Sequence, residues 1–382
     1  MKAKILNLYN LFLTHKEVII SIILLLTIPP IASMILGYEF KEHVVNNVTT
    51  AIVDHDNSTL SRSLVDKIKT NDAFNVTNYP ENNDDIENLI DKGEIVVGMI
   101  IPENFSIDLL NGQAPKVLVA YDGAQMSAVS SAKGRISEIL STIKAGYLIG
   151  LGGGKLGLMP GEVKDHIMPL NYTYRFLGNP AKSISNYMLQ GMLIGVAQVG
   201  IVILGVVVAN KKGYLPLWIK SIVCGLLGAI AILSTIIIQV KYFGFPFKGS
   251  VLAAIILTVL YSIGITSIGI TLGILKDDKM EAANSSMSLV SATILLAGYT
   301  FPVMAMPGMF GPISKYVPFL YYGIPMRDIS LLGLNLADVL PEIYWLTKFV
   351  LIMWGVLLMA FLAKTKKKSK EKSKIGTVDL EM

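Results

Sequence analysis

The chain alternates long apolar stretches with short polar ones over most of its 382 residues. A helix of about 20 apolar residues crosses the roughly 30 Å hydrocarbon core of a membrane. The sequence therefore predicts six transmembrane helices, one near the N-terminus and five in the second half, within nearly uncharged runs at 18–38, 186–210, 221–240, 249–275, 282–312 and 343–363.

Between the first two of these runs, residues 39–185 are polar and acidic. Segments rich in β-branched and aromatic residues predict four strands with helical segments between them: TTAIVDHD, AFNVTNY, EIVVGMIIP and KVLVAYDG. A longer amphipathic helix is predicted from Gln125 to about Ile149, then a glycine-rich break at Gly150–Gly154, and MPLNYTYRF predicts a further strand. The segment is therefore predicted to be a folded α+β domain.

Positive charge predicts the orientation, because lysine and arginine concentrate in cytoplasmic loops. Lys2, Lys4 and Lys16 place the N-terminus inside and the polar domain outside. The predicted fold class is an α-helical integral membrane protein with six transmembrane helices, arranged 1 + 5, an inserted extracellular α+β domain and both termini cytoplasmic. The predicted order is a cytoplasmic surface helix at 1–16, the first transmembrane helix at 17–38, the extracellular domain at 39–185, a five-helix bundle at 186–363 and a Lys-rich cytoplasmic tail at 364–382.

Composition agrees with a membrane location. Apolar residues make up 52% of the chain and charged residues 16%, which is more apolar than the core of a soluble domain requires. The net charge of +5 comes largely from the C-terminal lysines, so it indicates membrane topology rather than binding to nucleic acid. Cys224 is the single cysteine, which excludes an intramolecular disulfide and a thiolate metal site.

No catalytic, metal-binding or cofactor-binding residue is predicted. The glycine cluster LGGGKLG around Lys155 lacks the first glycine and the Ser/Thr of a phosphate-binding loop. The segment DHDNS resembles the start of a calcium loop, but the required glycine and closing glutamate are absent, which favours a turn followed by a helix cap. The histidines are scattered without metal-ligand spacing: His15, His43, His55 and His166.

A segment rich in glycine and proline interrupts the apolar pattern near 300–326. Gly298, Pro302 and Pro307 make a continuous helix unfavourable there. Broken backbone at membrane depth requires protein or a water-filled cavity around it, so the segment is predicted to re-enter the membrane as short pieces beside a translocation path. The alternative is an ordinary outer loop with an interfacial belt of aromatic residues.

Two further features have both a functional and a structural interpretation. Lys348 lies near the outer end of the last predicted span, where it could face a translocation path or extend its amine to the water layer. Two glycine pairs with GxxxG spacing predict close helix packing, although glycine is common in membrane helices: Gly191 with Gly195, and Gly269 with Gly273.

The order of these parts resembles the type-2 ABC transporter permeases, in particular the subgroup with a large domain between the first and second transmembrane helices. The resemblance rests on AIVDHDNSTLSRSLVDKI, IDKGEIVVGMIIPENFSIDLLNG, VLVAYDG, NYMLQGML and GYTFPVMAMP. It implies the permease subunit of an exporter in a bacterial plasma membrane, moving a lipid-like, drug-like or peptide cargo. It also implies two partners, a second permease copy or homologue and cytoplasmic ATPase subunits. ATP would bind those partner subunits, and the chain itself would be no enzyme.

The resemblance further implies that residues 1–16 and about 209–217 contact the ATPase. The second of these segments departs from the family pattern, because it holds Lys211 and Lys212 but no carboxylate. Another inner loop could share the docking surface through its charged residues: Lys276, Asp277, Asp278, Lys279 and Glu281.

Two other classes of protein remain as alternatives. A membrane-anchored surface receptor or adhesion-like protein would act through its extracellular domain, but a single helix would suffice to anchor it. An ion-coupled secondary transporter usually has buried charges near the membrane midplane and internal repeats, and neither is evident here.

Overall fold

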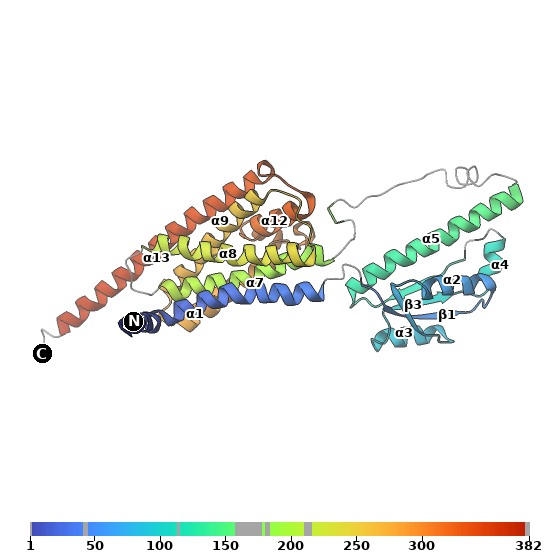
Figure 1. Cartoon of the computed structure of the whole chain (residues 1–382), viewed down its shortest axis with the longest axis horizontal. Helices are drawn as coiled ribbons and strands as arrows, with labels where there is room; N and C mark the ends of the chain where they lie inside the picture. Colours follow the sequence, from blue (N-terminus) through green and yellow to red (C-terminus); the bar gives the residue numbers. More distant parts are fainter. Residues whose placement is uncertain are drawn as a thin grey trace. The chain divides into compact units, whose positions relative to one another are not determined.

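Contacts between residues divide the chain into two units, Glu42–Arg175 and Met1–Lys41 with Phe176–Met382. We call them the inserted unit and the bundle. Figure 1 shows both in a computed structural model, which describes residues 2–40, 45–111, 113, 115–156, 178–179, 184–209 and 216–378.

The inserted unit is built on a four-stranded sheet with the order β2-β1-β3-β4. β1 pairs in parallel with both β2 and β3, and β4 is antiparallel to β3. Each strand lies within one of the four segments that the sequence pattern predicts. Their bounds are Val48–Asp54 for β1, Phe74–Asn78 for β2, Val97–Ile101 for β3 and Leu118–Tyr121 for β4.

Helices cover both faces of this sheet, as the ribbons of the inserted unit in Figure 1 show. On one face the core includes Ile52, Met99 and Leu64, and on the other it includes Val53 and Ile86. The helical crossovers between parallel strands make this an α/β unit, so the predicted α+β class is corrected. The helices are α2 at Thr59–Lys69, α3 at Asn83–Asp91, α4 at Phe105–Leu110 and α5 at Met126–Leu156.

Two local expectations for this unit have different outcomes. The segment DHDNS forms a turn and a helix cap, because the carboxylate of Asp54 accepts hydrogen bonds from the Asn57 amide and the Ser61 hydroxyl, while Ser58 caps α2. The predicted break at Gly150–Gly154 is wrong, since α5 continues through it. Glycine weakens a helix but keeps its N–H donor, unlike proline. The strand predicted at MPLNYTYRF lies outside the described residues.

The bundle consists of long apolar helices around a central α9, which contacts α7, α8, α10 and α13. Five helices of the described part of the chain are long and apolar enough to cross a membrane, which agrees with a helical, multi-pass membrane protein. The long helices are α1 at Lys2–Glu39, α7 at Ile184–Ala209, α8 at Leu217–Phe243, α9 at Val251–Leu275, α10 at Lys279–Leu296 and α13 at Leu340–Val378.

The sixth predicted span, at 282–312, does not form one long helix. Its helical part is α10, which ends at Leu296, and Gly298 follows with a φ of +75°. Short pieces then lead to α12: η1 at Val303–Ala305, α11 at Phe310–Ser314, α12 at Leu320–Leu332 and η2 at Ala337–Val339. The count of six transmembrane helices therefore stays a prediction.

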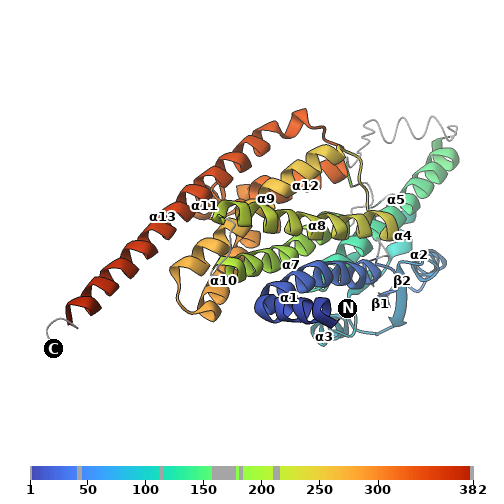
Figure 2. The same ribbon diagram turned by 60° about the vertical axis from the view of Figure 1, so that its left-hand side comes forward.

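Both terminal segments are helical and continuous with their neighbours. The predicted surface helix at 1–16 and the span at 17–38 belong to one helix, α1, although Figure 2 shows its first turns, in dark blue, running in a different direction from the rest. The predicted tail at 364–382 continues α13 as a helix to Val378.

Candidate functional site

Glycines allow α7 and α9 to pack with their backbones in close contact. A Cβ atom on Gly269 would lie 2.2 Å from the Val202 carbonyl oxygen, and one on Gly205 would lie 2.6 Å from the Thr266 oxygen. A Cβ on Gly273 would lie 2.9 Å from the Val206 oxygen. These positions have no room for any side chain, because backbone atoms cannot move aside as a flexible side chain can.

The other predicted glycine pair faces α10 and the segment that follows it. A Cβ on Gly191 would lie 2.0 Å from the ring of Tyr299, and one on Gly195 would lie 2.4 Å from Ile294. The Tyr299 hydroxyl also accepts a hydrogen bond of 3.0 Å from the Gly191 amide. Gly191 therefore forms the floor of a site for a tyrosine ring, which the spacing alone does not reveal.

A buried polar layer joins four helices of the bundle. The Tyr261 hydroxyl donates to the side-chain oxygen of Gln198, whose amide donates to the Val290 carbonyl at 3.2 Å. The Tyr261 ring stacks on Tyr322 with 4.3 Å between centroids, and the Tyr322 hydroxyl lies 3.0 Å from that of Thr258. The layer thus connects α7, α9, α10 and α12, and all its polar side chains are paired, as burial requires.

The predicted translocation-path residues lie in two places. Gly298, Pro302 and Pro307 follow one another in the broken segment, and a Cβ on Gly298 would lie 2.3 Å from the Val303 side chain. Lys348 is exposed on α13, with its amine 4.1 Å from the centroid of the Tyr344 ring. Among the described residues, no hydrogen bond or ion pair joins Lys348 to the broken segment, so this arrangement favours an amine that extends to the water layer.

The charged loop between α9 and α10 is tied to both terminal helices of the bundle. The Lys279 amine lies 3.0 Å from a carboxylate oxygen of Glu17 on α1. The Lys364 amine of α13 donates to the Ile274 carbonyl at 2.7 Å and lies 3.5 Å from Asp277. This corner therefore joins the end of α9 and the start of α10 to α1 and α13.

Within that loop, each of the three carboxylates has a partner in the chain. Asp278 caps α10 by accepting a 2.9 Å hydrogen bond from the Met280 amide, and Glu281 lies 2.7 Å from the Lys276 amine. The side chain of Asp277 is 82% exposed and that of Glu281 64%, so Asp277 is the more available of these two acids. Lys211 and Lys212 lie outside the described residues.

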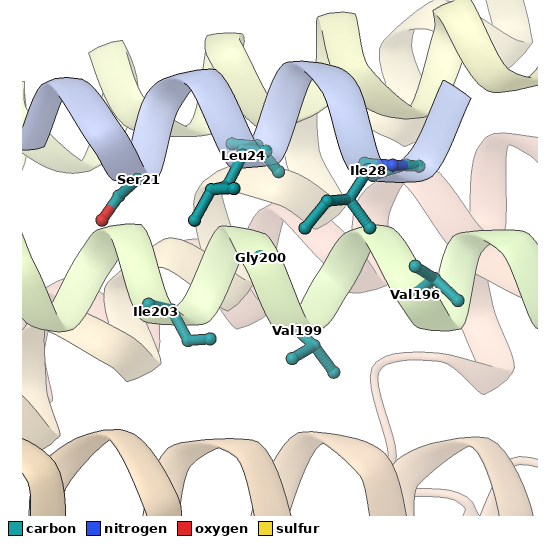
Figure 3. Close-up of a pocket in the computed structure, with 9 residues that line it drawn as sticks. Ser21, Leu24, Ile28, Val196, Val199, Gly200 and Ile203 are labelled. Atoms are coloured by element: carbon teal, nitrogen blue, oxygen red, sulfur yellow. The ribbon is translucent and has the colours of Figure 1, made fainter. Parts of the chain in front are cut away.

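An apolar groove of about 380 Å³ runs between α1 and α7. Figure 3 shows Ser21, Leu24 and Ile28 on α1 above Val199 and Ile203 on α7. Gly200 leaves the floor of the groove open, and the Ser21 hydroxyl is the single polar side-chain group among its nine lining residues. Because both helices are long enough to span a membrane, such a surface suits an acyl chain or another apolar group. The sequence pattern did not indicate this groove.

The described residues contain no group of three or more His, Cys, Asp or Glu side chains that could hold a metal ion. The glycine cluster around Lys155 lies in the last turns of α5, so its backbone amides belong to a helix rather than to a phosphate-binding loop.

Comparison with known proteins supplies a family. The family model described as ABC-2 family transporter protein matches residues 16–360. ABC transporter G family member 20 of Dictyostelium discoideum is 25% identical over 170 residues, which cover 44% of this chain and 21% of the relative. Probable multidrug ABC transporter permease YbhS of Escherichia coli K12 is 20% identical over 259 residues, which cover 63% of this chain and 66% of the relative. The chain thus spans less than two thirds of either relative, and no solved structure matches it significantly.

Proposed function

The chain belongs to the ABC-2 family of transporter proteins, and from that premise we propose that it is the permease subunit of an ATP-driven exporter. The observation that carries the proposal is the extent of the family match, which includes the bundle and the inserted unit together. Membership in this family means a multi-pass transporter permease that works with ATPase subunits. Export, the cargo and the arrangement of subunits are our proposals.

The bundle supports the proposal that transport and ATP hydrolysis lie on different chains. The described residues offer neither a phosphate-binding loop nor a metal cluster, so we place ATP binding and hydrolysis on separate cytoplasmic subunits. A second copy of the permease or a homologue would complete the transporter. Both termini would be cytoplasmic, the inserted unit would be extracellular, and the membrane would be the plasma membrane of a bacterium.

The cargo class follows from the groove between α1 and α7. Its lining is apolar apart from Ser21, so we propose lipid-like, drug-like or apolar peptide cargo rather than ions or sugars. The name of the Escherichia coli relative, a probable multidrug permease, agrees with this class. The broken segment after α10 would border the outer end of the path.

The direct test is purification of the full chain in mild detergent through a C-terminal tag, with mass spectrometry of the proteins that copurify. We expect a stoichiometric P-loop ATPase and ATP hydrolysis that disappears when the P-loop lysine of that subunit is replaced. Recovery of the bare chain, under conditions that keep a known ABC exporter intact, would contradict the exporter proposal. That result would favour a membrane-anchored receptor that acts through the inserted unit.

The loop between α9 and α10 gives a more local prediction. Asp277→Lys reverses an acid of the proposed docking surface that is 82% exposed. It should lower the amount of copurifying ATPase by about threefold, as expected for an exposed charge at an interface. Glu87→Lys is the matched control, because it makes the same change at an exposed position of the inserted unit. Equal ATPase recovery from both variants would remove this loop from the docking surface.

A further inference from the structure

Arg327 of α12 carries a mostly buried positive charge between two aromatic rings. Its side chain is 12% exposed. The central carbon of the guanidinium lies 4.1 Å from the centroid of the Tyr187 ring and 5.1 Å from that of Tyr299. Tyr187 lies on α7 and Tyr299 in the segment after α10, so three parts of the bundle meet at this arginine.

The guanidinium has almost no hydrogen-bond partners. An arginine has five N–H donors in a planar fork. In the described part of the chain none of them makes a hydrogen bond, and the Nη1 atom is buried without any acceptor. Among the described residues its one acidic partner is the neighbouring Asp328, whose carboxylate oxygen lies 3.7 Å from Nε, longer than a hydrogen bond. No described residue therefore offers an acceptor at hydrogen-bond distance to the edge formed by the two Nη atoms, of which Nη1 is buried.

Aromatic faces do not replace the missing acceptors. Stacking on a tyrosine ring attracts a cation by about 0.5–2 kcal/mol, but it leaves the N–H groups in the plane of the fork unpaired. A buried charge whose donors are unpaired is strongly destabilising, and oxyanions match the two parallel N–H groups of the fork. An oxyanion at the open edge would supply the acceptor that the buried Nη1 atom lacks among the described residues.

The location identifies the kind of molecule that could carry this oxyanion. Arg327 lies at the end of the bundle where α7 begins, because Ser330 of the same helix is hydrogen-bonded to Gln190. Tyr316 and Tyr344 are largely exposed on nearby segments of the chain, as aromatic residues are at the boundary between lipid and water. The amine of Lys248 lies at the same end, 3.0 Å from the Leu331 carbonyl. In a membrane, a positive site at this end of the bundle would lie at the level of the phospholipid headgroups.

We propose that Arg327, held between Tyr187 and Tyr299, binds the oxyanion headgroup of an anionic amphiphile, with its acyl part in the adjoining membrane. The rings fix the plane of the guanidinium, and the open Nη edge takes two oxygens of a phosphate or carboxylate. The site differs from the groove between α1 and α7, and it does not depend on the direction of transport or on the ATPase. A purely structural arginine would need no added ligand.

The test is the melting temperature of the full chain in mild detergent, measured against increasing phosphatidylglycerol. We expect a saturable rise for the natural protein, with half-saturation at a concentration at least about tenfold higher for Arg327→Gln, as for loss of a charge-assisted hydrogen bond. Arg327→Lys should lie between the two, because it keeps the charge but not the fork. Lys348→Gln is the matched control, since it also removes a cation above a tyrosine ring, but an exposed one.

Parallel titrations identify the source of the oxyanion. A rise with phosphatidylglycerol, but not with phosphatidylcholine or inorganic phosphate, supports the headgroup of an anionic lipid. An equal rise with inorganic phosphate would overturn the proposal that the ligand is an amphiphile. The proposal also fails if Arg327→Gln lowers only the starting melting temperature and keeps the full response to lipid, because this is the result for a structural arginine. Should Arg327→Gln fail to fold, the Arg327→Lys titration decides in the same way.

Discussion

Gly269→Ala should destabilise the bundle more than any other single methyl group added to its glycines. The new Cβ would lie 2.2 Å from the Val202 carbonyl oxygen and 3.2 Å from the Gly205 Cα, so two backbones would have to separate. Overpacking of this kind costs about 1–3 kcal/mol where side chains adjust, and the cost is higher against backbone. We expect a large fall in melting temperature or loss of the folded protein from detergent extracts.

Gly355→Ala on α13 is the matched control for this prediction. Nothing lies within 4 Å of the added Cβ, and the residue is exposed in the same bundle. Alanine favours a helix over glycine by about 0.5–1 kcal/mol, so this variant should melt at the natural temperature or slightly above it. If Gly269→Ala melts at the same temperature as Gly355→Ala, then α7 and α9 do not pack as closely as described.

Elements that depend on the residues within one short segment could be predicted from the sequence. Each strand of the inserted unit lies in a segment of β-branched residues, and the helix break appears where Gly298 and two prolines interrupt an apolar run. The order β2-β1-β3-β4 could not be predicted, because strand pairing depends on contacts between distant segments. The predicted break at the glycine run in α5 was wrong because glycine lowers helix propensity by only about 1 kcal/mol per residue and keeps its N–H donor.

The candidate sites divide in the same way. GxxxG spacing identified Gly269 as a position for close packing, but it could not show that Gly191 of the other pair receives the ring of Tyr299, 108 residues away. Arg327 had no motif around it, since the rings that hold it come from α7 and from the segment after α10. The groove between α1 and α7 likewise depends on two helices separated in sequence by the entire inserted unit. Sites of this type require the fold.

Tyr261→Ala should cause the second large loss of stability. The ring is fully buried, stacks on Tyr322 and meets Phe319 edge-on, with centroids 6.1 Å apart. Removing a buried aromatic ring from a core costs about 3–5 kcal/mol, largely through the cavity that remains. The part of this cost that comes from apolar transfer out of water is smaller in a membrane. The loss of packing contacts still lowers the stability. The melting temperature in detergent should fall sharply, whereas Tyr344→Ala, at an exposed ring of α13, should change it little.

Tyr261→Phe separates the hydroxyl from the ring. The variant keeps the stacking but leaves the Gln198 side-chain oxygen buried without its donor, at a cost of about 1–3 kcal/mol. Gln198→Leu in the same chain removes that orphaned acceptor, so the double variant should recover part of the stability lost by Tyr261→Phe alone. The difference between the double variant and the sum of the singles measures the coupling between α7 and α9 through this bond. Strictly additive losses would mean that the two side chains do not depend on each other, and the buried polar layer would then contribute packing alone.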